Sequence, residues 1–272
     1  MTLYGLNGAT TMPLAQAEEI RQVGVAGFDL IEFRAPKIRQ FLQTGTLAAL
    51  KQHLDAAGLK PLSINSLEQV NTRPAKEAKA LVADCETQAR WAQALGCPYL
   101  VAVPGFLEEP APEREIIPRT VDALAPLVEI AAAHEVRLGF EFLGFANCSV
   151  NSLRLARDVV RRLDSASVGL VIDTFHFFLS DEPLELLAEL GPGDLFLFHV
   201  NDAEDVPRAQ LRDQHRVLPG DGIAPLRKMW EVLQRHELID HASLELFRPQ
   251  YWDAPPEPFL PKALASLRRV FP

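Results

Sequence analysis

The sequence of 272 residues contains few cysteines, and they do not form the pattern of a disulfide framework or a zinc site. Cys85, Cys97 and Cys148 are odd in number, and no two of them have C-x-x-C spacing. Free thiols suit a reducing compartment. The N-terminal segment also lacks a basic region followed by an apolar one, so no secretory signal is expected. These absences favour a cytoplasmic protein.

Long apolar runs and an excess of positive charge are missing as well. The longest stretch without a charged residue, Trp91–Leu107, is interrupted by Gln, Gly and Pro, so a membrane span is not expected. Acidic residues (36) outnumber Lys and Arg (27), which gives a net charge of −9. Nucleic-acid-binding proteins usually carry a basic footprint. We therefore expect neither a membrane nor a nucleic acid as a partner.

The glycine-rich motifs of nucleotide-binding folds are also absent. No G-x-G-x-x-G follows a predicted strand, because Gly191-Pro192-Gly193 lacks the third glycine and precedes a strand instead. No P-loop is present. This weakens a doubly wound sheet, which is the alternative to the fold described next.

The sequence does contain a regular alternation of short apolar, β-branched segments with longer amphipathic ones. Strands are predicted at Leu3–Asn7, Phe28–Phe33, Pro61–Asn65, Tyr99–Val103, Arg137–Phe142, Val168–Asp173, Leu195–Asn201 and Ala242–Phe247. Helices are predicted at Pro13–Val25, Leu47–Ala57, Pro74–Leu95, Thr120–His134, Asn151–Leu163, Pro183–Leu190, Ala224–His236 and Pro261–Val270. Eight strand–helix units without a linker predict an α/β fold, a (β/α)₈ TIM barrel forming one domain over residues 1–272.

Four side chains able to bind a metal stand at the ends of the last four predicted strands. They are Glu141 in RLGFEF, Asp173 in VGLVID, His199 in LFLFHV and Glu245 in ASLELF. A single such acid more often caps a helix or faces solvent, and a single buried His is more often structural. Four at equivalent positions of a barrel would converge at its C-terminal face and balance one another's charge through a cation. Carboxylates with one imidazole suit Mn²⁺, Zn²⁺, Co²⁺ or Mg²⁺ without selecting among them.

Two further side chains are candidates for substrate binding. His176 follows Asp173 by three residues in VIDTFHFF, on the predicted loop after the sixth strand, and Arg216 lies in the long polar loop after the seventh. Near a metal, an imidazole and a guanidinium can bind substrate oxygens and stabilise an enediolate. A His at a helix start and an Arg on a surface loop are the alternative interpretations.

At these residues the sequence resembles the xylose-isomerase-like TIM-barrel superfamily and, within it, the inosose (2-keto-myo-inositol) isomerases of myo-inositol catabolism. The likeness extends from the first predicted strand to the last. It rests on Asn7–Thr11, PLSINSLEQVNTR (Pro61–Arg73), YLVAVPG (Tyr99–Gly105), FEFLGFANCSVN (Phe140–Asn151), VGLVIDTFHF (Val168–Phe177), HVNDAEDVP (His199–Pro207), RVLPGDG (Arg216–Gly222) and SLELFRPQYW (Ser243–Trp252).

The resemblance implies an isomerase that depends on one divalent metal ion and acts on a small polyol ketone or sugar. It implies that Glu141, Asp173, His199 and Glu245 bind the metal, and that His176 and Arg216 contact the substrate. It also implies that Glu141 and Glu245 move a proton through a cis-enediolate, converting 2-keto-myo-inositol into 1-keto-D-chiro-inositol. A homo-oligomer is compatible with the sequence.

Alternatives within the superfamily are a ketose 3-epimerase and a sugar-acid dehydratase of the 3-dehydroshikimate type. A DNA-repair enzyme similar to endonuclease IV is disfavoured, since it would need more His ligands and a basic face. A barrel that binds metal without catalysis is a further alternative.

Overall fold

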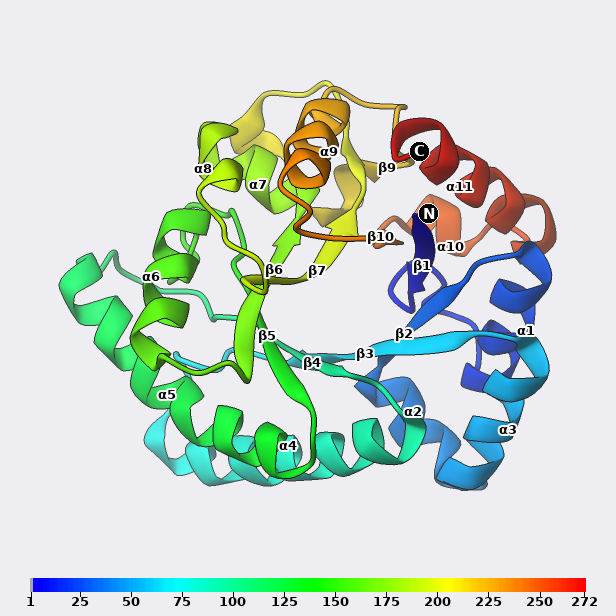
Figure 1. The fold of residues 1–272 in the computed structure, drawn as a ribbon, viewed down its shortest axis with the longest axis horizontal. Helices are drawn as coiled ribbons and strands as arrows, with labels where there is room; N and C mark the ends of the chain where they lie inside the picture. Colours follow the sequence, from blue (N-terminus) through cyan, green and yellow to red (C-terminus); the bar gives the residue numbers. More distant parts are fainter. Residues whose placement is uncertain (1) are drawn as a thin grey trace.

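In the computed structural model, which describes residues 2–272, eight parallel strands close into a barrel (Figure 1). Around the barrel their order is β1-β10-β7-β6-β5-β4-β3-β2. Their bounds are β1 (Leu3–Asn7), β2 (Leu30–Arg34), β3 (Lys60–Leu67), β4 (Tyr99–Ala102), β5 (Arg137–Glu141), β6 (Val168–Asp173), β7 (Leu195–Val200) and β10 (His241–Leu244). The predicted TIM barrel with eight strands is confirmed.

Helices surround the strands on the outside of the barrel (Figure 1). Their bounds are α1 (Gln16–Ala26), α2 (Ala35–Phe41), α3 (Leu47–Ala57), α4 (Ala75–Leu95), α5 (Glu113–Ala133), α6 (Leu153–Leu163), α7 (Thr174–Ser180), α8 (Glu185–Ala188), α9 (Leu226–Arg235), α10 (Pro249–Trp252) and α11 (Pro256–Val270). Among the described residues, no helix has the length and apolar character required to cross a membrane.

The sequence prediction erred at several helices. Helix α5 begins at Glu113 rather than Thr120, because it accommodates Pro118, a residue that usually ends a helix. Two short helices directly after strands, α2 and α7, were not predicted. As a result His176, predicted on a loop, lies in the first turn of α7.

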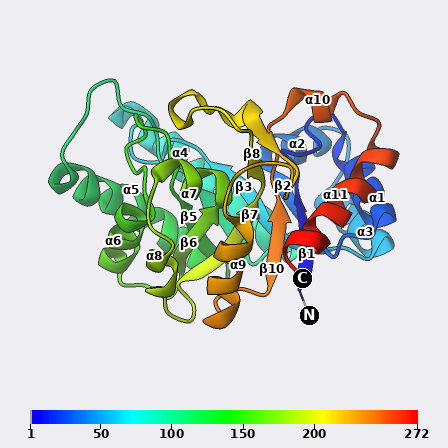
Figure 2. The ribbon, with the colours of Figure 1, turned by 90° about the horizontal axis from the view of Figure 1, so that it is seen from above.

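The long polar segment after β7 contains a small antiparallel sheet. It pairs β8 (Asp202–Ala203) with β9 (Arg216–Val217), so Arg216 lies in a strand rather than in an irregular loop. The buried Asp202 side chain accepts hydrogen bonds from the backbone N–H of Gly220 (2.9 Å) and Ala224 (2.8 Å). One carboxylate thus joins the start of the segment to its end. Figure 2 shows β8 and α10 at one end of the barrel and the two chain termini near the other.

The barrel interior changes from apolar to polar along the strand direction. Val171 and Leu197 belong to an apolar cluster inside the barrel. Two residues further along the same strands stand Asp173 and His199, which are register partners. Because alternate residues of a strand point to the same side, these polar side chains also point inward, at the C-terminal end of the strands.

Candidate metal centre

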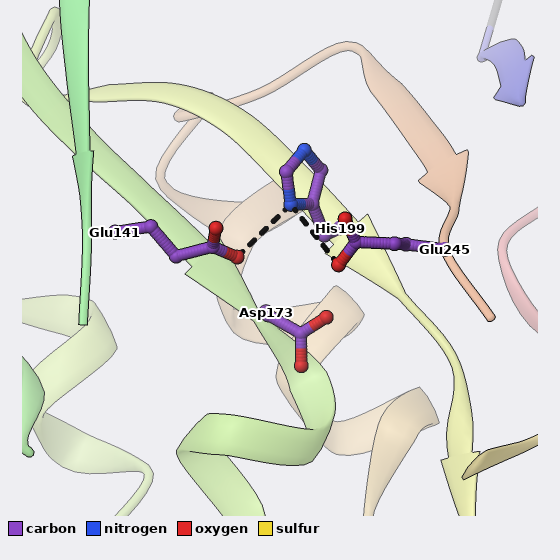
Figure 3. A group of neighbouring side chains, drawn as sticks. All are labelled: Glu141, Asp173, His199 and Glu245. Atoms are coloured by element: carbon purple, nitrogen blue, oxygen red, sulfur yellow. Dashed lines mark hydrogen bonds and ion pairs between the residues drawn. The ribbon is translucent and has the colours of Figure 1, made fainter. Parts of the chain in front are cut away.

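The four side chains predicted at the ends of the last barrel strands converge in the structure. Glu141, Asp173, His199 and Glu245 each offer a ligand atom, and these atoms all lie within 4.8 Å of one another (Figure 3). All four residues are buried. Strands β5, β6, β7 and β10 are consecutive neighbours in the barrel, which brings the four together although the sequence separates them. Glu245 follows the last residue of β10 directly.

His199 turns one ring nitrogen toward this cluster and the other away from it. Its Nδ1 lies 3.0 Å from Glu141 Oε1 and 3.6 Å from Glu245 Oε2, whereas Nε2 lies 3.0 Å from Glu32 Oε2. Burial alone would lower the pKa of His199, but Glu32, Glu245 and Glu141 together raise it well above the usual value. Nδ1 is therefore the nitrogen that faces a prospective cation.

Glu32 is a component of the site that the sequence analysis missed. Its fully buried carboxylate accepts hydrogen bonds from His199 and from the hydroxyls of Ser63 (2.5 Å) and Ser243, and from the Asn65 amide (3.1 Å). Burial would raise its pKa, but the His199 charge and these donors lower it to about 2. The available signal was a Glu inside the apolar strand LIEFR.

Both carboxylate oxygens of Asp173 accept hydrogen bonds from the protein. Its Oδ1 caps α7 by accepting the backbone N–H groups of Phe175 (2.8 Å) and His176 (3.0 Å). Its Oδ2 accepts from the Asn201 amide (2.8 Å) and from Arg216 Nη1 (2.8 Å). Burial would raise the pKa of Asp173, but the Arg216 charge and the hydrogen bond from the His176 backbone N–H lower it. The carboxylate is thus held ionised and in one orientation.

Arg216 reaches the cluster from β9 with every N–H group engaged. Nε and Nη2 donate to Asp213 Oδ1, Nη1 donates to Asp173 and to Glu245 Oε2 (3.1 Å), and Nη2 also donates to His176 Nε2 (3.0 Å). A guanidinium has five N–H donors, and these contacts use all five. Because Arg216 can only donate, His176 accepts at Nε2 and carries its proton on Nδ1. Burial, aided by the Arg216 charge, lowers the pKa of His176, so this imidazole is neutral.

A cavity of about 250 Å³ opens above the cluster. Glu141, Glu245, His176 and Arg216 line it, whereas Asp173 and His199 lie beneath its floor. The lining also contains polar residues that the sequence analysis did not single out. These are Arg34, Asn65, Ser66, Glu68 and Asp213.

The cluster has the composition expected of a divalent-cation site. Three carboxylates and one imidazole nitrogen are a mixed oxygen and nitrogen donor set that such ions accept. Burial, together with repulsion from Glu141 and against the attraction of His199, raises the pKa of Glu245 to about 8. The protein's own cations therefore leave the cluster with more negative charge than it can hold ionised at neutral pH, and a divalent cation would relieve that excess.

Comparison with known proteins assigns the chain to a family. A model of the family described as xylose isomerase-like TIM barrel matches residues 19–270. The chain therefore belongs to the xylose isomerase-like TIM-barrel family.

The likeness extends to one kind of isomerase within that family. The inosose isomerase of Halalkalibacterium halodurans is 33% identical over 248 residues, which is 90% of this chain and 88% of the relative. The crystal structure of the IolI protein with a binding zinc atom superposes with a TM-score of 0.93 at 31% identity, covering 100% of this chain and 98% of that one. These relationships place the chain among the isomerases, and the resemblance stated from the sequence is confirmed.

More distant relatives have other activities. A 3-dehydroshikimate dehydratase of Pseudomonas aeruginosa is 32% identical over 136 residues, 49% of this chain and 21% of that protein. The structure of a D-psicose 3-epimerase has a TM-score of 0.79 at 18% identity, covering 100% of this chain and 99% of that one, a likeness that shows the fold alone.

Proposed function

We propose that this protein is a divalent-metal-dependent isomerase that converts 2-keto-myo-inositol into 1-keto-D-chiro-inositol. The observation that carries the proposal is the buried cluster of three carboxylates and one imidazole, whose ligand atoms lie within 4.8 Å of one another at the floor of a small polar cavity. The 33% identity to an inosose isomerase supports this substrate.

The metal would be held by Glu141, Asp173, Glu245 and the Nδ1 atom of His199. When bound, a divalent cation acts as a Lewis acid that draws electron density from a substrate carbonyl and acidifies the neighbouring C–H. The donor set is compatible with Mn²⁺, Zn²⁺, Co²⁺ or Mg²⁺. The Glu32 carboxylate, 3.0 Å from His199 Nε2, would keep the imidazole proton on Nε2 and leave Nδ1 free for the cation.

Glu141 and Glu245 line the cavity and would carry the substrate proton. One carboxylate removes the proton from the hydroxyl-bearing carbon next to the ketone, leaving a cis-enediolate. The hydroxyl proton passes to the former carbonyl oxygen, and a proton returned to the former carbonyl carbon completes the shift. Their placement beside the same cavity supports a transfer within one bound ring. The arrangement is compatible with either Glu141 or Glu245 removing the first proton.

His176 and Arg216 would bind the substrate oxygens on which negative charge develops, and Arg216, whose N–H groups are all engaged within the protein, would exchange one of its present hydrogen bonds to do so. The neutral His176 has a buried Nδ1 without a hydrogen-bond partner among the described residues, and Arg216 places a permanent positive charge at the cavity wall. Each group can stabilise an oxyanion without losing its own proton. Phe145, whose ring lies edge-on to His176 with centroids 5.2 Å apart, lines the cavity beside it and limits entry of water.

Three assignments accompany this function. We propose that one domain spans residues 1–272, that the substrate is a small neutral molecule and not a nucleic acid or a membrane component, and that the protein works in the cytoplasm. The three cysteines, which are free and buried, support a reducing location. Sedimentation analysis tests whether the protein forms a homo-oligomer.

Proton NMR in D₂O after metal reconstitution tests the function. Wild-type protein should convert 2-keto-myo-inositol and incorporate solvent deuterium at the carbon that gains a proton. Inversion at C3 of a ketohexose would indicate a ketose 3-epimerase, and loss of water from 3-dehydroshikimate would indicate a dehydratase. Metal binding without turnover of any of these compounds would contradict an enzymatic role on them.

A further inference from the structure

Arg34, the last residue of β2, is a cation in the cavity wall with few partners. Its Nε is buried and has no hydrogen-bond partner among residues 2–272. The ion pair that it forms within this part of the chain joins Nη2 to Glu68 Oε1 at 3.8 Å, which is longer than a hydrogen bond. All five N–H donors of Arg216, which lines the same cavity, are engaged, whereas Arg34 has donors to offer.

The position of Arg34 is fixed against the same aromatic ring as Arg216. The Arg34 guanidinium carbon lies 5.7 Å from the centroid of Phe247, and that of Arg216 lies 5.1 Å from it. Phe247 lines the cavity with both arginines. A side chain at Gly8 would press on Arg34, since a Cβ there would stand 3.1 Å from Arg34 Cγ. The free donors therefore belong to a side chain that is only 17% exposed and packed between Gly8 and Phe247.

Glu68 adds an acceptor of opposite charge beside these donors. The Ser66 hydroxyl donates to Glu68 Oε1 at 2.6 Å, the same oxygen that pairs with Arg34. Oε2 is therefore available to accept a hydrogen bond. The side chain of Glu68 is 51% exposed and lines the cavity, so a bound molecule can reach it.

An adjacent donor and acceptor of opposite charge match one class of ligand. A hydroxyl group both donates and accepts, so neighbouring hydroxyls of a polyol can bond to Arg34 and Glu68 together. A carboxylate can only accept, and it would meet the like charge of Glu68.

We infer that Arg34 and Glu68 are specificity-determining residues, which bind hydroxyl groups remote from the reacting carbons and select a neutral polyol ketone over an anionic sugar acid. The inference rests on the proposed function, because it takes the carbons next to Glu141 and Glu245 as the reacting ones.

Steady-state kinetics of Arg34→Gln tests the donor. Loss of charge-assisted hydrogen bonds to hydroxyls should raise KM for 2-keto-myo-inositol roughly 10- to 100-fold. The value of kcat should stay within about threefold, since such bonds are equally strong in ground and transition states. Arg34→Lys keeps the charge but loses the planar set of donors, so its KM should lie between those of the wild type and Arg34→Gln. Arg39→Gln on the exposed face of α2 is the matched control, and circular dichroism during thermal unfolding checks that each variant folds.

Calorimetry with two non-reacting probes tests the acceptor. Metal-loaded wild type should bind myo-inositol more tightly than quinate, an anionic ring polyol of similar size. Glu68→Gln removes the like charge and should shift the ratio of the two dissociation constants toward quinate by roughly tenfold. Glu129→Gln on the exposed side of α5 serves as the control, and elemental analysis confirms equal metal content.

The outcomes separate the inference from the proposed function. If the wild-type protein isomerises 2-keto-myo-inositol and Arg34→Gln has the same KM for it as the wild type, the inference is overturned and the proposed function stands. A wild type that binds quinate more tightly than myo-inositol also overturns it, whatever the turnover. A wild type that turns over no inosose but prefers myo-inositol, with Glu68→Gln shifting that preference, supports the binding roles and refutes the proposed reaction.

Discussion

Two buried clusters of charge in this barrel have different designs. In one, Lys37 Nζ donates to Glu19 Oε1 (2.6 Å) and to the backbone carbonyls of Gly8 (3.1 Å) and Thr11 (2.7 Å), so a single cation meets a single carboxylate. The other, around Arg216, contains more carboxylates than its cations can match. The first cluster lies outside the cavity and the second forms its floor.

The difference shows how a structural ion cluster can be separated from a functional one. Glu19 also accepts from Thr11 and Gln16 (2.7 Å), so its remaining acceptor capacity is used inside the protein. Burial raises the pKa of Glu19 as it raises that of Glu245, so the two clusters differ in composition: the cluster around Arg216 sets Glu141, Asp173 and Glu245 against too few cations and borders a cavity. A closed, balanced cluster holds loops together, whereas an unbalanced one beside a cavity needs an external cation. Five measurements test this contrast: three substitutions, in order of decreasing expected effect, and two pH dependences.

Glu245→Gln should have the largest effect. Removing one of the two carboxylates that face the substrate should lower kcat by roughly 10²- to 10⁴-fold, the usual contribution of a positioned base. The variant should keep its fold and part of its metal affinity. Glu19→Gln, which alters the other cluster, should retain near-normal kcat per folded molecule. Turnover of Glu245→Gln at the wild-type rate would refute its catalytic assignment.

Lys37→Met should act on stability instead. It leaves the Glu19 carboxylate buried without its cation, which should cost about 3–5 kcal/mol of the free energy of unfolding. Urea denaturation followed by circular dichroism measures this change. The fraction that remains folded should show wild-type kcat, and a loss of kcat with normal stability would mean that the two clusters are not separate in function.

Glu32→Gln should weaken the metal site although Glu32 is not itself a proposed metal ligand. An amide oxygen is a poorer acceptor than a carboxylate for the His199 Nε2–H, so metal affinity should fall roughly 10- to 100-fold. Competition with a chromogenic chelator measures the affinity. Ser266→Ala, at a buried hydroxyl in α11 remote from the centre, provides a control. Unchanged affinity would show that Glu32 only fills space.

The pH dependence of the metal-free protein gives the most specific signal. Because the pKa of Glu245 in the folded chain is about 8 and its usual value is 4.5, the folded chain holds a proton that the unfolded chain has released. Stability of the metal-free protein should therefore fall as the pH rises from about 4.5 to about 8.

Metal binding should change with pH in the opposite direction. The cation must displace the proton of Glu245 and the one that the raised pKa keeps on His199. Apparent affinity should rise about tenfold per pH unit for each proton released. Isothermal titration in buffers of different ionisation enthalpy counts these protons, and a count of zero at pH 7 would contradict the assignment of both groups.

Much of the barrel followed from sequence periodicity, because each strand is a short apolar run and helices such as α1, α3 and α4 end at a glycine. Gly27, Gly58 and Gly96 all adopt a left-handed conformation, with φ of 87°, 68° and 83°. The short helices α2 and α7 escaped prediction, because one turn or two of helix directly after a strand has no full amphipathic period.

Some residues of the candidate site could be predicted from the sequence and others could not. Glu141, Asp173, His199 and Glu245 were identifiable because a charged or imidazole group at the end of an apolar strand is costly without a partner. Glu32 gave the same signal earlier in the chain, but its strand is not a sequence neighbour of the others. The contact between Glu32 and His199 depends on closure of the barrel, as does the approach of Arg34. Spatial partners of this kind are not encoded in local spacing.

The carboxylate of Asp202 holds the two ends of the segment after β7 together, independently of the residues between them. Since it joins the start of the segment to Gly220 and Ala224, and β9 returns Arg216 to the barrel mouth, the stretch before the buried Leu211, at 204–210, is anchored on both sides. Its length can change without displacing the guanidinium. Insertions and deletions within it would therefore reshape the surface pocket that Arg208 and Ala209 line, while the guanidinium stays in place.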